Sequence, residues 1–241
     1  QDHVIHFYQL QAMDWVDVMS ALKADPAETA AIAKSLSDWP LSSAAYFAGV
    51  QKKLKDSIAY GQYSIFTNGY WGHPAYKLPP EVNLLGVAHY LQALVWQRDM
   101  IKIHTILGGK NPHPNFLVGG MACAINMNND QAINQFSLSY LKQLVQTCHD
   151  FIHKVYYPDI VAIAGFYKDY AHIGASNPNF FCTGAPSEIN TGAPAGKGMI
   201  KPGVLLNGDY RNVLPFDQDK IREFVTSSWY RYTEGRGPGS V

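Results

Sequence analysis

Three side chains that can bind a metal or move a proton stand together at the start of the sequence, namely Asp2, His3 and His6. On a helix, residues three or four positions apart share a face, so His3 and His6 are neighbours and Asp2 lies beside His6. A carboxylate with two imidazoles can serve as a metal-ligand set or transfer protons. The cluster therefore suggests a metal-binding or proton-handling site, but an ordinary polar helix start would give the same pattern.

A second pair, His149 and His153, is separated by four positions and lies beside Cys148 and Asp150. Imidazoles at this spacing can hold zinc, but a complete site needs a third ligand and usually a nearby base. No glutamate follows the first histidine, so the pattern is not that of the zinc proteases. We expect a packing or solvent-facing role for this pair.

Two more histidines lie in loops that proline stiffens, His73 in "WGHPAY" and His113 in "NPHPN". Each proline fixes its own φ and has no N–H to donate, so these loops have few conformations. Rigid loops often carry binding residues, and they are equally common where subunits pack together. Both functions stay open for His73 and His113 from the residues alone.

Other kinds of site find little support. The three cysteines, Cys123, Cys148 and Cys182, form no C-x-x-C pair, and their odd number argues against a closed set of disulfides. We expect three buried free thiols. A phosphate-binding glycine loop and a nucleophilic serine elbow are both missing from the sequence. The net charge is zero, so nucleic-acid binding has no electrostatic basis.

The elements that must position these residues are mainly helices. Helical spacing of apolar residues and turn signals predict a mainly α fold with small strands and long interface loops. We expect helices at residues 1–23, 27–38, 42–60, 80–107, 137–156 and 218–230, with Ser137 capping the fifth. Short strands are expected at 116–126 and 203–209, and a loop-rich segment at 166–202.

The surface and the two ends of the sequence suggest that more chain or a partner covers this polypeptide. Charged residues make up 16% of the chain, against about 25% in a typical globular domain. An amphipathic run begins at Gln1 without a cap, and "TEGRGPGSV" ends in a glycine-rich loop. We therefore expect residues 1–241 to be an internal part of a longer protein.

Five separated blocks carry a resemblance over essentially the whole chain: "DHVIHFYQL", "NGYWGHPAYKLPPE", "GGKNPHPNFLVGGMACAIN", "LLNGDYRNVLP" and "EFVTSSWYRY". In this order they resemble the large subunit of nickel–iron hydrogenase, most closely the membrane-associated uptake group. The resemblance implies that residues 1–241 are the central part of one large-subunit domain. It also implies that the complete protein oxidises dihydrogen to protons and electrons.

In that family a nickel–iron centre with cyanide and carbon monoxide ligands is held by two C-x-x-C pairs, one near each end of the subunit. This chain contains neither pair, so the resemblance implies that it lacks the metal ligands and is inactive alone. The implied partners are a small subunit with iron–sulfur clusters and a membrane cytochrome b. The implied location is the periplasmic face of the membrane, in the cell envelope.

The resemblance assigns roles to two residues of this chain. Asp2 matches an aspartate that lies above the metal centre without ligating it, and there it contacts an arginine from later in the subunit. His113 matches a histidine that faces the proximal iron–sulfur cluster of the small subunit, where an imidazole can tune the cluster's potential. We expect Asp2 to lie at a surface without an arginine partner from this chain, and His113 to be accessible.

Two other functions remain as alternatives. A non-catalytic scaffold subunit derived from the same fold would resemble the family equally well, but its complete sequence would lack both C-x-x-C pairs. A zinc or dinuclear hydrolase would instead use Asp2, His3, His6 and His149 as ligands, and bound zinc would reveal it.

Overall fold

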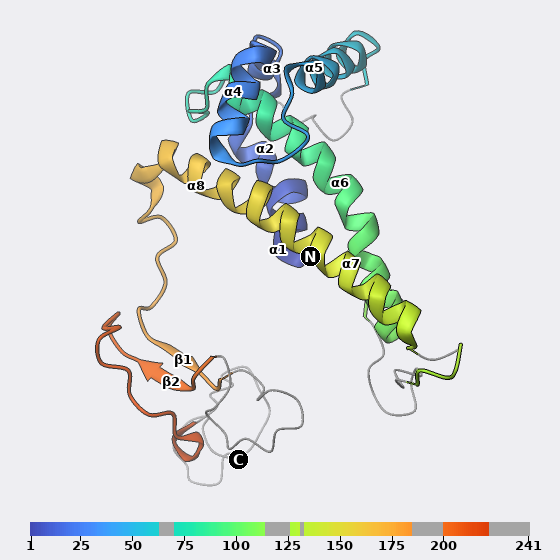
Figure 1. The fold of residues 1–241 in the computed structure, drawn as a ribbon. Helices are drawn as coiled ribbons and strands as arrows, with labels where there is room; N and C mark the ends of the chain where they lie inside the picture. Colours follow the sequence, from blue (N-terminus) through green and yellow to red (C-terminus); the bar gives the residue numbers. More distant parts are fainter. Residues whose placement is uncertain (63–69, 114–125, 131–132, 185–199, 222–241) are drawn as a thin grey trace, which may run out of the picture. The chain divides into compact units, whose positions relative to one another are not determined.

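The structure is a computed structural model that describes residues 1–62, 70–113, 126–130, 133–184 and 200–221 (Figure 1). The chain divides into two compact units, Gln1–Ala171 and His172–Val241. Among the described residues, the long helices all lie in the first unit, and the second unit contains a small antiparallel pair of strands. The mainly α fold is thereby confirmed.

The elements are as follows in chain order. The α-helices are α1 (Asp2–Ile5), α2 (Ala12–Trp15), α3 (Val18–Ala21), α4 (Pro26–Leu36), α5 (Ala44–Ala59), α6 (Pro80–Gly108), α7 (Gln135–Phe151) and α8 (Tyr157–Phe166). Two π-helical segments, His6–Gln11 and Ile152–Tyr156, join α1 to α2 and α7 to α8. Single 3₁₀ turns lie at Lys168–Tyr170 and Gln218–Lys220, and the strands are β1 (Phe180–Cys182) and β2 (Gly203–Leu205). In the described part of the chain, no helix is long and apolar enough to cross a bilayer.

The prediction of a single helix at residues 1–23 is wrong, because the backbone becomes extended at Val16 and Asp17 before α3 begins. Asp17 is buried, and its carboxylate accepts from the Ser20 amide at 2.9 Å and from the Gly72 amide at 2.8 Å. The Asp17 amide donates to Oδ1 of buried Asn83 at 2.9 Å. Capping by an aspartate competes with the continuous helix. The break thus ties the N-terminal segment to α6 and to the loop before it.

Helix α6 is the central element of the first unit, and its predicted extent is confirmed within a residue at its C-terminal end. Residues near its start pack with α3, α4 and α5 in one apolar cluster that includes Leu84, Val87 and Phe47. Residues further along pack with α1 and α7 in a second cluster that includes Trp96 and Phe151. Figure 1 shows α7 beginning near the end of α6 and running back beside it.

Gly86 allows α6 to approach the break in the N-terminal segment. A Cβ at position 86 would lie 2.7 Å from Cγ2 of Val16, which is only 1% exposed. Valine is short and stiff at χ1, so it cannot move aside easily. This close contact requires a residue without a side chain in the middle of a long helix.

We expect Gly86→Ala to lower the free energy of unfolding by about 1–3 kcal/mol, because overpacking outweighs the better helix propensity of alanine. Gly49 on α5 is the matched control, since a Cβ there meets nothing within 4 Å. Gly49→Ala should stabilise the protein by about 0.5–1 kcal/mol. Denaturant unfolding of both variants measures the difference, and equal shifts would contradict the close-packing argument.

The helix expected at 137–156 begins earlier and continues further than the sequence indicates. Its N-cap is Asn134, whose side chain accepts from the Ser137 amide, so Ser137 is not the cap. The helical run continues through Pro158 to Phe166. Pro158 has no N–H for the carbonyl of Lys154, four residues earlier, and the Ser37 hydroxyl donates to that carbonyl instead. A side chain from another segment therefore serves a carbonyl to which the proline cannot donate.

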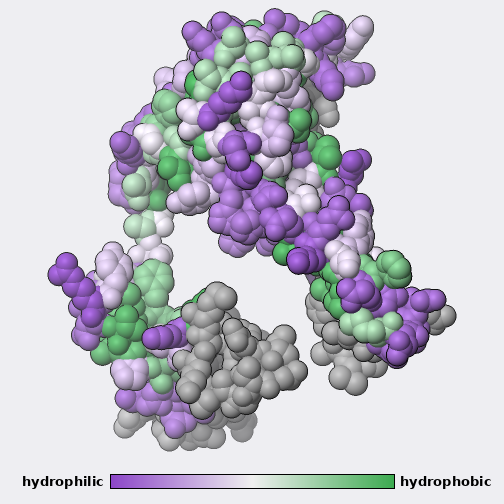
Figure 2. Space-filling model, in the orientation of Figure 1, coloured by the Kyte–Doolittle hydropathy of each residue, from purple (hydrophilic) through white to green (hydrophobic). Residues whose placement is uncertain are grey.

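The second unit contains a short antiparallel pair of strands. Strand β1 lies within the segment 166–202 that was expected to be loop, and β2 directly follows that segment. Strand β1 pairs antiparallel with β2, and Phe181 faces Val204 in the register. β2 confirms the strand expected at 203–209, and a turn follows with positive φ at Asn207 and Gly208. Figure 2 shows hydrophobic side chains at the surface of this unit, where Phe180 and Phe181 are 60% and 65% exposed.

Two expected elements lie largely outside the described residues. The strand at 116–126 falls almost entirely outside the described residues. Where the sequence predicts a helix at 218–230, the structure has a 3₁₀ turn at Gln218–Lys220 followed by extended backbone at Ile221. Residues 222–230 lie outside the described part.

Candidate functional site

A cavity of about 820 Å³ lies between the N-terminal helical segment and α8. One wall carries Asp2, His3 and His6, which confirms that these three residues face one space. The opposite wall is largely apolar and includes Ile160 and Ile163. The arrangement places groups that can hold or exchange protons beside an apolar space.

The N-terminal segment is held in place by its opposite face. Val4 and Tyr8 are 2% and 1% exposed, and they pack in the second apolar cluster against α6 and α7. Because they are four positions apart, they share a buried face, which leaves Asp2, His3 and His6 exposed. Asp2 also lies in the first turn of α1, where a negative charge is favourable. Among the described residues, no lysine or arginine forms an ion pair with Asp2.

Behind this wall lies a buried polar network that sequence reasoning missed. Oδ2 of Asp159 accepts from the hydroxyl of Tyr8 at 2.6 Å and is 2.7 Å from Nδ1 of His89. All three side chains are buried, and they come from the first π-helix, α6 and α8. A single acid in the apolar run "YPDIVAIAGF" was the only signal in the sequence.

The network has two chemical consequences. Burial, followed by the nearby charge of Asp159, raises the pKa of Tyr8 well above its usual value of 10.0, so Tyr8 remains a hydrogen-bond donor. Nε2 of His89 is buried and has no hydrogen-bond partner among the described residues. One carboxylate oxygen thus joins three segments, two of which form walls of the cavity.

A second cavity of about 310 Å³ lies on the other side of Phe7 and Ile163, which line both spaces. Its walls include Tyr8, Asp159 and apolar side chains from α4 and α6. Phe7 and Ile163 thus lie between the two cavities, and each is a chain neighbour or near neighbour of a residue of the buried network.

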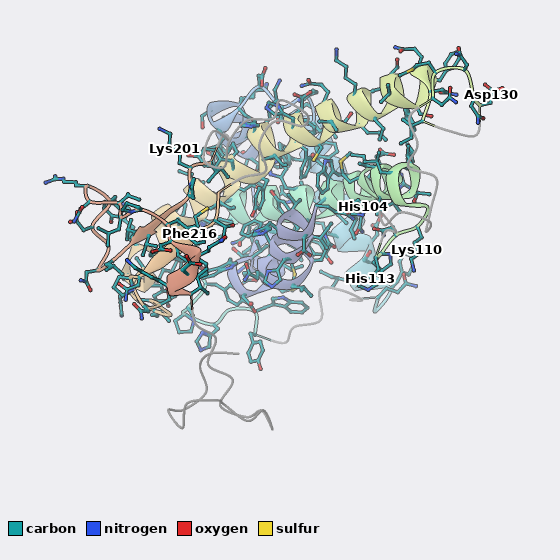
Figure 3. The ribbon with its side chains drawn as sticks, turned by 90° about the horizontal axis from the view of Figure 1, so that it is seen from below. His104, Lys110, His113, Asp130, Lys201 and Phe216 are labelled. Atoms are coloured by element: carbon teal, nitrogen blue, oxygen red, sulfur yellow. The ribbon has the colours of Figure 1, made fainter. Side chains whose placement is uncertain are left out.

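The other predicted residue, His113, lies in the loop after α6 and is exposed, as expected. It does not line the cavity that carries Asp2. Its φ is +59°, in the left-handed region that few residues other than glycine adopt. Figure 3 shows His104, Lys110 and His113 together at the C-terminal end of α6. Nδ1 of His104 lies 2.7 Å from Oδ1 of Asn111, just before His113.

The remaining candidates do not form a metal site. His73 is exposed, and its Nδ1 accepts from the Ala75 amide within its own turn. The rings of His149 and His153 lie 4.1 Å apart at the surface, as the expected solvent-facing role requires. Among the described residues, no group of three or more histidine, cysteine, aspartate or glutamate side chains could hold a metal ion. The zinc-hydrolase alternative therefore finds no support there.

The cysteines differ from the expectation of three buried thiols. Cys148 is half-buried, and burial raises the pKa of its thiol. Cys182 is exposed in β1, which makes the expectation wrong for this residue, because the two-stranded sheet leaves its side chains without a cover. Cys123 lies outside the described residues.

Comparison with known proteins identifies the class. Residues 1–240 match the nickel-dependent hydrogenase family, and the chain belongs to this family. It is 48% identical over 248 residues to the hydrogenase-1 large chain of Citrobacter freundii, covering 98% of this chain and 42% of that protein. It is 49% identical over 241 residues to the uptake hydrogenase large subunit of Rhizobium leguminosarum bv. viciae, covering 97% of this chain and 40% of that protein.

Solved structures agree with this assignment. The as-isolated Ni-Fe-Se hydrogenase of D. vulgaris Hildenborough is similar with a TM-score of 0.52 at 28% identity, over 66% of this chain and 31% of that chain. A variant of the hydrogenase from Desulfovibrio vulgaris Hildenborough gives a TM-score of 0.60 over 95% of this chain and 36% of that chain. At 24% identity, the second likeness shows the fold alone. The chain thus spans about 40% of the length of the curated relatives it matches.

Proposed function

We propose that the chain is the central part of the large, catalytic subunit of an uptake nickel–iron hydrogenase, and that the complete protein oxidises dihydrogen to two protons and two electrons. The observation that carries this proposal is the similarity to uptake hydrogenase large subunits, 49% identical over 97% of the chain for the Rhizobium protein. A single large-subunit domain would include both compact units of this chain together with further sequence.

The described residues do not themselves fit the ligand set of a nickel–iron centre. Such a centre needs several soft thiolates close together, whereas Cys148 and Cys182 lie in different units and neither belongs to a metal-capable group. We therefore assign the ligands to cysteine pairs outside this sequence, and the cyanide and carbon monoxide to the iron. Residues 1–241 alone should bind neither metal and should be inactive.

In this proposal the cavity that carries Asp2 faces the metal centre. Asp2 is exposed at the cavity, and no described lysine or arginine pairs with it, so its carboxylate is available to an arginine from elsewhere in the subunit. A carboxylate near a metal site acts by its charge and by hydrogen bonding, which orient other groups without binding the metal.

His113 is proposed to meet the proximal iron–sulfur cluster of a small subunit. Its exposed imidazole has an N–H donor, which is the group that can hydrogen-bond to cluster sulfur and change the reduction potential. Electrons would leave the large subunit by this route. Exposed apolar residues, including Phe136 at 86% and Phe180 at 60%, are consistent with surfaces covered in an assembly. A heterodimer at the periplasmic face of the membrane, with a cytochrome b, completes the proposed assembly.

The test of this function is metal analysis and hydrogen uptake of the complete protein, purified with its small subunit. We expect nickel and iron in the complex and reduction of an electron-accepting dye that depends on hydrogen. The chain of residues 1–241, purified as a control, should show neither. A complete coding sequence without two C-x-x-C pairs, or a complex without nickel, would instead support the non-catalytic scaffold.

A further inference from the structure

The loop that carries His113 is tied back to the helix it leaves. His104 lies in the last turns of α6, and its Nδ1–H donates to the side-chain oxygen of Asn111, with 2.7 Å between the two atoms. The bond crosses the end of the helix and joins positions seven residues apart.

The backbone between these residues has little freedom. Gly109 ends α6 with φ of +77°, and its amide donates to the Thr105 carbonyl at 2.9 Å. Pro112 fixes its own φ by its ring. The bond from His104 to Asn111 therefore links the end of α6 to the residue two positions before His113. The backbone between these two residues is short and stiff.

The conformation of His113 itself needs support from its surroundings. A histidine with φ of +59° lies in a region that costs free energy, and such a residue persists only where neighbouring contacts hold it. On the side of α6, the bond between His104 and Asn111 holds the residues that lead into His113. His104 is the side chain of α6 that supplies this support by reaching Asn111.

We propose that His104 is a positioning residue that, through Asn111, fixes the loop presenting His113 to the partner subunit. This proposal rests on the proposed role of His113 at the proximal cluster. His104 would not touch the cluster, and its effect on the cluster potential would arise only through the position of the His113 imidazole.

The experiment is a redox titration of the proximal cluster, followed by electron paramagnetic resonance in the complete two-subunit enzyme. His113→Ala should shift the midpoint potential of the cluster. His104→Ala should shift it in the same direction by a smaller amount. His104→Asn should restore the wild-type value, because the asparagine amide nitrogen lies close to the position of Nδ1 and can still donate to Asn111. His149→Ala, which removes an exposed imidazole from α7, is the control and should change nothing.

A second measurement separates this inference from the role of His113. Amide hydrogen exchange at residues 109–113 of the same complexes should rise in His104→Ala and stay unchanged in His104→Asn. An unchanged potential in His113→Ala would overturn the role of His113 at the cluster, while faster exchange in His104→Ala would still support a positioning bond. A shift in His113→Ala without one in His104→Ala, or unchanged exchange in His104→Ala, would overturn the positioning role.

Discussion

Asp159→Ala is expected to lower the free energy of unfolding by about 3–5 kcal/mol, because it removes one partner of a buried polar pair and leaves two buried donors without an acceptor. The carboxylate joins the first π-helix, α6 and α8 through Tyr8 and His89. Tyr8→Phe removes only one of these bonds and should cost about 1.5–3 kcal/mol. Denaturant unfolding of the purified protein measures both changes.

The matched control is Asp169→Ala. Asp169 also forms an ion pair, with Lys77 at 2.6 Å, but its side chain is 62% exposed. An exposed pair of this kind contributes little to stability, because solvent screens it. If Asp159→Ala cost no more than Asp169→Ala, the network would not hold the three segments together.

Asp2→Ala in the complete enzyme is expected to lower the rate of hydrogen oxidation by about 10–100-fold, the range found when groups around a metal site are removed. Because Asp2 is not a metal ligand in the proposed function, the nickel and iron contents should stay at wild-type values. Asp2→Asn keeps the shape and one acceptor oxygen but loses the charge, so its rate indicates how much of the effect depends on the charge. Dye reduction under hydrogen, together with metal analysis, measures both quantities.

Asp14→Ala provides the comparison for this effect. Asp14 is an exposed acid of the same N-terminal segment, but it lines a different cavity, beside His73. Its removal should leave the rate close to wild type. Equal rates for the Asp2 and Asp14 variants would remove Asp2 from the proposed site.

The long helices could be predicted from the sequence because the information lies within each segment. α6 has apolar residues at helical spacing, Pro80 at its start and Gly109 at its end, and its predicted limits agree with the structure. The face shared by Asp2, His3 and His6 was predictable for the same reason, since residues three and four positions apart are neighbours on an α-helix.

The features that could not be predicted depend on partners far away in the sequence. The break at Asp17 involves Gly72 and Asn83, which lie 55 and 66 residues away. Asp159 meets Tyr8 across 151 residues, so nothing near position 159 reveals its acceptor role. The roles of Asp2 and His113 came from the family resemblance, because local spacing identifies neighbours but not the groups that other chains bring.

The hydroxyl of Ser37 has a consequence for the evolution of this protein. Because Pro158 cannot donate to the Lys154 carbonyl, which accepts from Ser37 across 117 residues, we expect the effect of replacing Ser37 to depend on the residue at position 158. We expect loss of the hydroxyl to cost more stability while the proline remains than after a residue with an amide N–H has replaced it. The order in which lineages can accept changes at these two sites is thereby constrained.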